Sequence, residues 1–170
     1  TFGCRGILIN SVNTPESGLH KCIYPHIVNW TGGAAWFAQH FYDYFRYTRD
    51  MDYLKEHAMP FMYETALFYE DFVVENEDGY YDLYPSVSPE NTASNVARNM
   101  GTGGIETSRN ATMEIALLKE LLTNLLEASR LTGLYREKAE VWRTMLSKVR
   151  PYMVNEDGAI KEWTDPYYKD

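Results

Sequence analysis

The residue best placed for acid–base chemistry is Glu90, which lies in the proline-rich stretch Tyr84–Asn91, YPSVSPEN. Pro85 and Pro89 restrict the backbone just before it. A carboxyl group held on a stiff loop beside aromatic rings is poorly solvated, which raises its pKa and lets it donate a proton near neutral pH. Taken by itself, the spacing fits a solvated glutamate in a proline-rich turn better than a catalytic acid.

Glycoside hydrolysis needs two acid or base groups that flank one bond. Further acidic candidates are Glu106, Glu162 and Asp165. The last two lie on either side of Trp163, where they can line the same pocket entrance as Glu90 or be solvated residues of a hairpin. The hairpin interpretation is the better supported of the two.

The composition narrows the class of ligand. The 170 residues include 24 acidic and 16 basic residues, a net charge of −8, which argues against nucleic-acid binding. No apolar run is long enough for a membrane span. Aromatic residues make up 15% of the chain. Polar-tipped rings with few cations fit a protein that handles an uncharged sugar, although composition alone favours a tyrosine-rich core.

Two cysteines are too few for a disulfide scaffold, and the four scattered histidines have no metal-ligand spacing. We therefore expect no structural metal. The chain begins with Thr1 and reads as a segment of a longer protein.

Hydrophobic spacing predicts a largely helical chain. In the first helix, residues 31–47, Trp36 and His40 share one face beside a stripe of phenylalanines expected in the core. Residues 1–30 are expected to form a loop with one strand at 6–9, residues 80–84 an extended piece, and residues 85–109 a long loop. The other expected helices span residues 51–57, 60–75, 111–131 and 134–149, with Asn110 as a helix N-cap.

The tetrapeptide NEDG occurs twice, at residues 76–79 and 155–158, each time after a helix and before an aromatic and acidic segment. A toroid of helical hairpins would produce such a repeat. Four shared residues are as consistent with coincidence as with repeated architecture.

Several segments resemble, in order, the catalytic domain of glycoside hydrolase family 95, the α-L-fucosidases and α-L-galactosidases. They are GGAAW, FAQHFYDYFRYTRD, DYLKEHAMPFMYETALFYEDFV, YPSVSPEN, TMEIALLKELLTNLLEASRLTG and GAIKEWTD. The resemblance covers residues 3–165 and implies an all-α fold, part of an (α/α)6 barrel with short β-hairpins and long loops. The single segment 1–170 would be roughly half of that barrel, with helical hairpins over residues 31–170, and the rest of the parent chain would complete it.

The resemblance also implies inverting release of a terminal sugar, α-L-fucose or α-L-galactose, from oligosaccharides without a cofactor. The family's general acid maps onto Glu90, and Trp36 and His40 map onto its sugar pocket. Asn91, next to Glu90, is a further substrate-binding candidate that we expect to hydrogen-bond a sugar hydroxyl. Asn10, a further substrate-binding candidate, stands where the family usually has histidine. The asparagine pair and the aspartate that activate water in the family have no matching positions here.

A second hypothesis is a catalytically inactive sugar-binding or structural relative of the family, which the departure at Asn10 favours. A third is a free-standing helical module. That hypothesis is weaker, because half a barrel would leave a wide apolar inner face exposed. The resemblance favours an extracytoplasmic location, periplasmic or secreted.

Overall fold

The computed structural model describes residues 2–10, 29–88, 91–96 and 107–169. The described chain is mostly helical, and its only sheet is a short antiparallel hairpin of two strands. The elements are α2 (Gly33–Thr48), α3 (Met51–Tyr53), a π-turn (Leu54–Ala58), α4 (Met59–Phe72), β1 (Val74–Glu75), β2 (Tyr81–Asp82), α5 (Thr112–Thr132), a 3₁₀ turn (Arg136–Lys138) and α6 (Ala139–Lys148).

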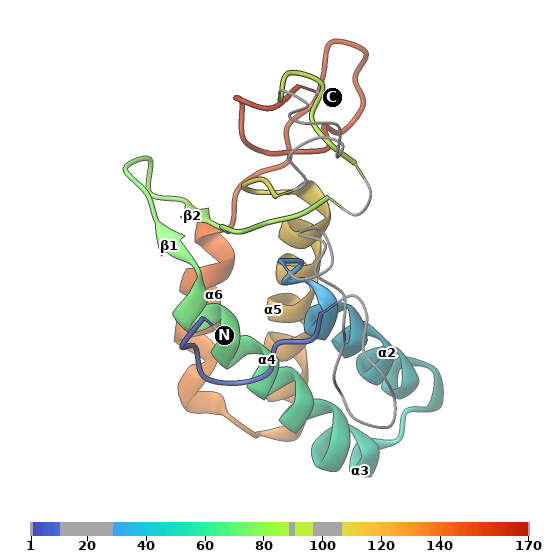
Figure 1. Cartoon of the computed structure of the whole chain (residues 1–170). Coiled ribbons are helices and arrows are strands. Elements are labelled where there is room, and N and C mark those ends of the chain that lie inside the picture. Colours follow the sequence, from blue (N-terminus) through green and yellow to red (C-terminus); the bar gives the residue numbers. More distant parts are fainter. Residues whose placement is uncertain (1, 11–28, 89–90, 97–106, 170) are drawn as a thin grey trace.

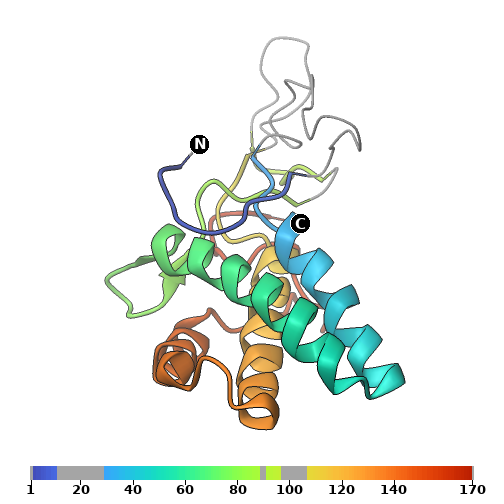
Figure 2. The same cartoon turned by 90° about the horizontal axis from the view of Figure 1, so that it is seen from below.

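Helix α5 is the centre of the structure and packs against α2, α4 and α6 (Figures 1 and 2). Its apolar stripe recurs at helical spacing, so one broad face enters the core. The core residues on this stripe are Ile115, Leu117, Leu118, Leu121, Leu122 and Leu125, all nearly or fully buried. Trp142 of α6 is also fully buried. The helical fold expected from the sequence is therefore confirmed.

Two glycines allow the start of α2 to approach its neighbours closely. A Cβ atom on Gly33 would lie 2.1 Å from the carbonyl oxygen of Ile9. A Cβ atom on Gly32 would lie 2.9 Å from a methyl carbon of Leu117 on α5. Only glycine fits at these two positions without displacing backbone or core, so the GG pair fixes the place from which α2 starts.

The chain stays helical from Met51 to Phe72, whereas the sequence predicted two separate helices. The Asp50 side chain caps the start by accepting from two backbone N–H groups of the first turn. Pro60 lies in the first turn of α4, as predicted, and the turn before it widens into the π-turn. Because proline has no N–H to bond back into that turn, the widening lets the helix continue.

Other local predictions are wrong. The helix predicted at 134–149 begins only at Ala139, after the 3₁₀ turn. The predicted helix at 60–75 ends at Phe72, because Val74 and Glu75 pair with β2 instead. Residues 6–9 form no strand within the described chain, although Ile7 N–H donates to the carbonyl of Glu64. Asn110 does not cap α5. Its φ is positive, and its side chain bonds the backbone of Leu83 and the carboxylate of Asp82.

The two NEDG segments form the same turn. In each, the asparagine Oδ1 accepts from the backbone N–H two residues later, and the glycine has a φ near +80°. The first turn joins β1 to β2, and the second lies inside a bridge between Val154 and Ile160. The repeated sequence therefore corresponds to a repeated local structure.

Three segments meet at the N-terminal end of α5, at the top of Figure 1. Residues 83–88 pair with residues 107–111 through two backbone hydrogen bonds between Ser86 and Ser108, of 2.9 and 2.7 Å. The third segment, residues 161–168, joins them where Thr164 N–H donates to the carbonyl of Asn110. We call this meeting point of residues 83–88, 107–111 and 161–168 the α5 mouth.

Candidate active site

A buried carboxylate, Glu114, lies in the first turn of α5 beneath the α5 mouth and is fully inaccessible to solvent. Its Oε1 accepts hydrogen bonds from the backbone N–H of Thr31, at 2.7 Å, and from the Thr31 hydroxyl, at 3.1 Å. Its Oε2 accepts a short hydrogen bond from the Ser86 hydroxyl, at 2.5 Å. One side chain thus connects the residues that lead into α2 with the segment that leads towards Glu90.

Opposing effects act on this carboxyl group. Burial disfavours the ionised form and raises the pKa of Glu114 to about 7, while hydrogen bonds from Ser86, Thr31 and Val87 act in the opposite direction. Tyr69 on α4 donates its hydroxyl to the carbonyl of Thr31 at 3.0 Å. Burial, together with the nearby Glu114, raises the pKa of Tyr69. The neighbouring phenol therefore stays protonated and adds no second charge to this interior.

The segment before Glu90 is fixed by two serines. Ser86 Oγ accepts from the backbone N–H of Ala111 at 2.9 Å in addition to its bond with Glu114. Ser88, the last described residue before Glu90, donates its hydroxyl to Glu162. Both serines are buried, so the backbone leading to Glu90 is held at two points against α5 and the 161–168 segment.

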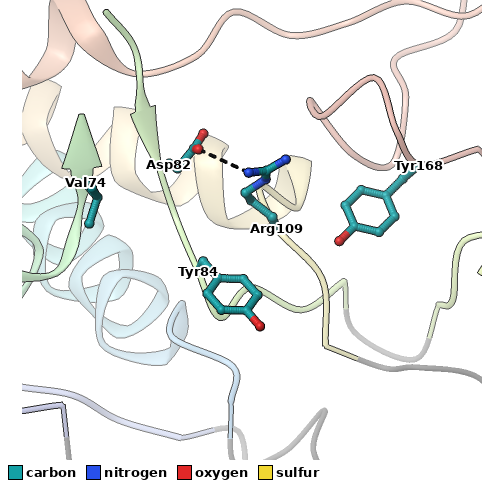
Figure 3. Close-up of a pocket in the computed structure, with 5 residues that line it drawn as sticks. All are labelled: Val74, Asp82, Tyr84, Arg109 and Tyr168. Atoms are coloured by element: carbon teal, nitrogen blue, oxygen red, sulfur yellow. Dashed lines mark ion pairs between the residues drawn. The ribbon is translucent and has the colours of Figure 1, made fainter. Parts of the chain in front are cut away.

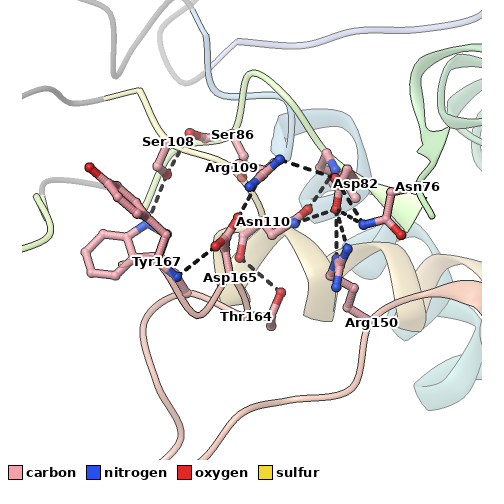
Figure 4. A network of polar contacts seen from close by, with 12 residues as sticks. Asn76, Asp82, Ser86, Ser108, Arg109, Asn110, Arg150, Thr164, Asp165 and Tyr167 are labelled. Atoms are coloured by element: carbon pink, nitrogen blue, oxygen red, sulfur yellow. Dashed lines mark hydrogen bonds and ion pairs between the residues drawn. The ribbon is translucent and has the colours of Figure 1, made fainter. Parts of the chain in front are cut away.

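A polar network centred on Asp82 lies on the other side of the mouth (Figure 4). Asp82 Oδ1 accepts from Arg150 Nε, at 2.8 Å, and from Asn110 Nδ2, also at 2.8 Å. Arg109 Nε donates to Asp165 Oδ2 at 2.6 Å, and Arg109 Nη1 lies 3.6 Å from Asp82 Oδ2. Asp165 is only 5% exposed, so the expectation of a solvated hairpin residue was wrong for it.

The network borders a cavity of about 410 Å³ lined by Val74, Asp82, Tyr84, Arg109 and Tyr168 (Figure 3). Arg109 lies between the two tyrosine rings. Its guanidinium is held by carboxylates while about half of the side chain remains exposed. Aromatic faces beside fixed hydrogen-bond donors are a surface suited to a polar, uncharged ring.

The sequence-predicted binding residues lie on three separate parts of the chain. Trp36 and His40 share an exposed face of α2, where the Trp36 ring meets Trp30 edge-on at 5.6 Å. Asn10 is half-buried, with its backbone beside the start of α2. Asn91 is exposed, and its N–H donates to the carbonyl of Ser88 at 3.2 Å.

Glu90, the predicted general acid, and Glu106 lie outside the described residues. The described parts of the chain nevertheless define where the Glu90 segment starts and ends. Ser88 precedes it at the α5 mouth. The residues that follow lie beside the end of the 161–168 segment, since Ser94 N–H donates to the carbonyl of Lys169 at 2.8 Å. The buried Ala93 packs with Ala111 and Trp163.

Sequence reasoning missed the role of Glu114, although a signal was present. Glu114 lies three and four positions before Leu117 and Leu118, which places it on the apolar stripe of α5 rather than on its solvent face. A carboxylate on a core stripe needs buried donors. Its partners, Thr31 and Ser86, are far away in sequence, and no local pattern identifies them.

Among the described residues, no cluster of three or more histidine, cysteine, aspartate or glutamate side chains has the arrangement of a metal site. Within the same ranges, no helix has the length and apolar character needed to cross a membrane.

Comparison with known proteins identifies the family. The sequence model of the glycosyl hydrolase family 95 catalytic domain matches residues 1–170. The chain belongs to this family of glycoside hydrolases. It is 28% identical over 149 residues to alpha-L-fucosidase 2 of Arabidopsis thaliana, an alignment that covers 81% of this chain and 16% of the relative. It is 30% identical over 91 residues to kojibiose hydrolase of Flavobacterium johnsoniae, covering 54% of this chain and 12% of the relative.

The chain therefore spans a small part of the length of these curated relatives. Its helices, with α5 packed between α2, α4 and α6, are consistent with part of the family's helical toroid.

Proposed function

We propose that the protein containing this chain is an inverting glycoside hydrolase that releases a terminal α-L-fucose or a similar sugar from oligosaccharides, with Glu90 as its general acid. The family match supports glycoside hydrolysis. The similarity to a plant alpha-L-fucosidase supports the choice of sugar. We also propose that these 170 residues supply about half of the catalytic barrel and that the rest of the parent chain completes it.

The observation that carries this proposal is the anchoring of the chain just before Glu90. Ser86 and Ser88 are both buried, and their hydroxyls bond carboxylates on two different segments. A general acid must stay within hydrogen-bond reach of the leaving oxygen, so its backbone has to be held in place. A solvated glutamate on a surface turn needs no such anchoring.

In this proposal, Glu90 protonates the departing glycosidic oxygen while a water attacks the opposite face of the sugar ring. The base system that activates this water belongs to the rest of the parent chain. Trp36 packs against the apolar face of the sugar, and its exposed position on α2 leaves its ring available. His40, Asn91 and Asn10 donate or accept hydrogen bonds at the sugar hydroxyls. The chemistry requires no cofactor.

The test uses the full parent protein. Wild type and Glu90→Gln are assayed against oligosaccharides ending in α-L-fucose, α-L-galactose or, as a contrasting substrate, α-D-glucose as in kojibiose. Proton NMR of the first product formed gives the anomer released. We expect cleavage of a fucose-like terminus with inversion, and a loss of roughly a hundredfold or more in Glu90→Gln.

Two results would overturn parts of the proposal. Equal rates for wild type and Glu90→Gln would show that Glu90 is not the general acid. A wild-type protein that binds these glycans but cleaves none of them would favour the alternative hypothesis, an inactive sugar-binding relative of the family.

A further inference from the structure

We propose that Glu114 is a positioning residue for catalysis: by bonding both Ser86 and Thr31, it fixes the segment 83–88, which leads to Glu90, relative to the start of α2. This inference rests on the proposed function, because it concerns how Glu90 is held at its substrate. Glu114 itself is fully buried and does not touch the substrate.

The geometry of the carboxylate supports this role. Its two oxygens face two different segments: Oε1 faces Thr31, at 2.7 and 3.1 Å, and Oε2 faces Ser86, at 2.5 Å. Thr31 is two residues before α2, the helix that carries Trp36, and Ser86 is four residues before Glu90. The group that joins these segments therefore joins the candidate acid to the candidate sugar platform.

The carboxylate is attached to α5, the helix that packs against α2, α4 and α6. Glu114 is in the first turn of α5, and the next residue, Ile115, is fully buried in the core. The helix N-terminus also favours negative charge in its first turn. The segment before α2 and the segment 83–88 are thus both bonded to one residue of the central helix. A direct contact between the two segments alone would let them shift together.

In its ionised form, above a pKa of about 7, the carboxylate accepts on both sides, and in its protonated form one oxygen can donate to a hydroxyl. Thr31 and Val87 present backbone N–H donors, and Ser86 and Thr31 present hydroxyls. An apolar residue would leave buried donors unpaired, and an amide would place its own NH2 against one of these segments. Glu114→Gln therefore preserves side-chain volume but replaces one acceptor oxygen by an NH2 group, which faces backbone N–H donors of Thr31 or Val87.

Loss of positioning has a kinetic signature that loss of stability lacks. A misplaced acid slows substrates whose leaving group must be protonated, whereas a glycosyl fluoride loses fluoride with little help from an acid. Variants are therefore compared on a natural oligosaccharide and on the corresponding glycosyl fluoride. The quantity measured is the ratio of the two kcat/KM losses.

The experiment uses the parent protein with Glu90→Gln as the reference for complete loss of the acid. For Ser86→Ala we expect roughly a tenfold loss on the oligosaccharide, and for Glu114→Gln a larger one, with less than about threefold on the fluoride for each. The losses should lie in kcat rather than KM. If Glu114→Gln does not fold, the kinetics of Ser86→Ala test the inference, since that substitution removes only a single hydroxyl.

Ser129→Ala is the matched control. Ser129 is also buried, lies near the other end of α5, and donates to the carbonyl of Leu134 at 2.7 Å. Its variant should lose a comparable amount of thermal stability and show no difference between the two substrates. Equal losses on both substrates for Ser86→Ala and Glu114→Gln would overturn the inference. If Glu90→Gln itself shows no difference between the substrates, the proposed function fails instead.

Discussion

The buried position of Glu114 makes a quantitative prediction about stability and pH. Its pKa rises from the ordinary 4.5 to about 7 in the folded protein, with burial as the largest cause. Each pKa unit is worth about 1.4 kcal/mol, so the difference corresponds to about 3 kcal/mol. Because the folded state holds this proton more tightly, the stabilising contribution is fully present below pH 4.5 and is lost as the pH rises through about 7.

The assay compares the unfolding free energies of the parent protein and its Glu114→Gln variant by denaturant titration from pH 4.5 to 8. The variant cannot titrate at this position, and all other groups cancel in the difference. We expect the free energy of wild type minus that of the variant to fall by about 3 kcal/mol across this range.

A flat difference would show that Glu114 keeps its ordinary pKa in the folded protein. A difference that increases with pH would show that the donors from Thr31, Ser86 and Val87 outweigh burial and keep the carboxylate ionised. Either result would refute the electrostatic reasoning. A folded parent protein is required at each pH, which circular dichroism checks.

Further predictions concern the packing around the mouth. Arg150→Ala should lower the unfolding free energy by about 3 kcal/mol, because it removes a largely buried partner of Asp82. Arg143→Ala breaks an exposed ion pair and should lower it by less than about 1 kcal/mol. Equal losses would contradict the importance given to the buried network. Gly6→Ala should destabilise the protein by more than about 2 kcal/mol, because the added Cβ would lie 2.0 Å from a backbone oxygen of α4. Gly79 has a similarly positive φ but open space around it, so Gly79→Ala should cost about 1 kcal/mol. Denaturant midpoints of the parent protein measure both pairs, and similar losses for the two glycines would refute the proposed close approach.

The sequence predicted the helices well where a single face carries the apolar residues. The leucine stripe of α5 is buried, as its periodicity predicts, and α2 and α5 form close to the predicted bounds. The phenylalanine stripe of α2 was expected in the core, but Phe45 is buried whereas Phe37 is 52% exposed. The boundaries fail where tertiary partners decide them. Val74 leaves the helix to pair with Asp82, and Asn110 turns away from the helix end to bond Asp82 and Leu83.

The candidate site was predictable only in part. The proline-rich segment before Glu90 and the tryptophan after the glycine pair stand out by residue type. The connection between them does not, because Thr31, Ser86 and Glu114 are common residues separated by dozens of positions. Glu114 connects these segments only because it is buried, and the packing of distant segments determines that burial. Asp165 shows the same effect, since its ion pair with Arg109 depends on the meeting of distant segments.

The most direct measurement of the central claim is the kcat/KM of the parent protein and of Glu90→Gln on an oligosaccharide ending in α-L-fucose. We expect that wild type cleaves it and that the variant loses roughly a hundredfold or more in kcat/KM, because an alkoxide leaving group needs a proton. Equal rates for the two proteins would contradict the assignment of Glu90 as the general acid.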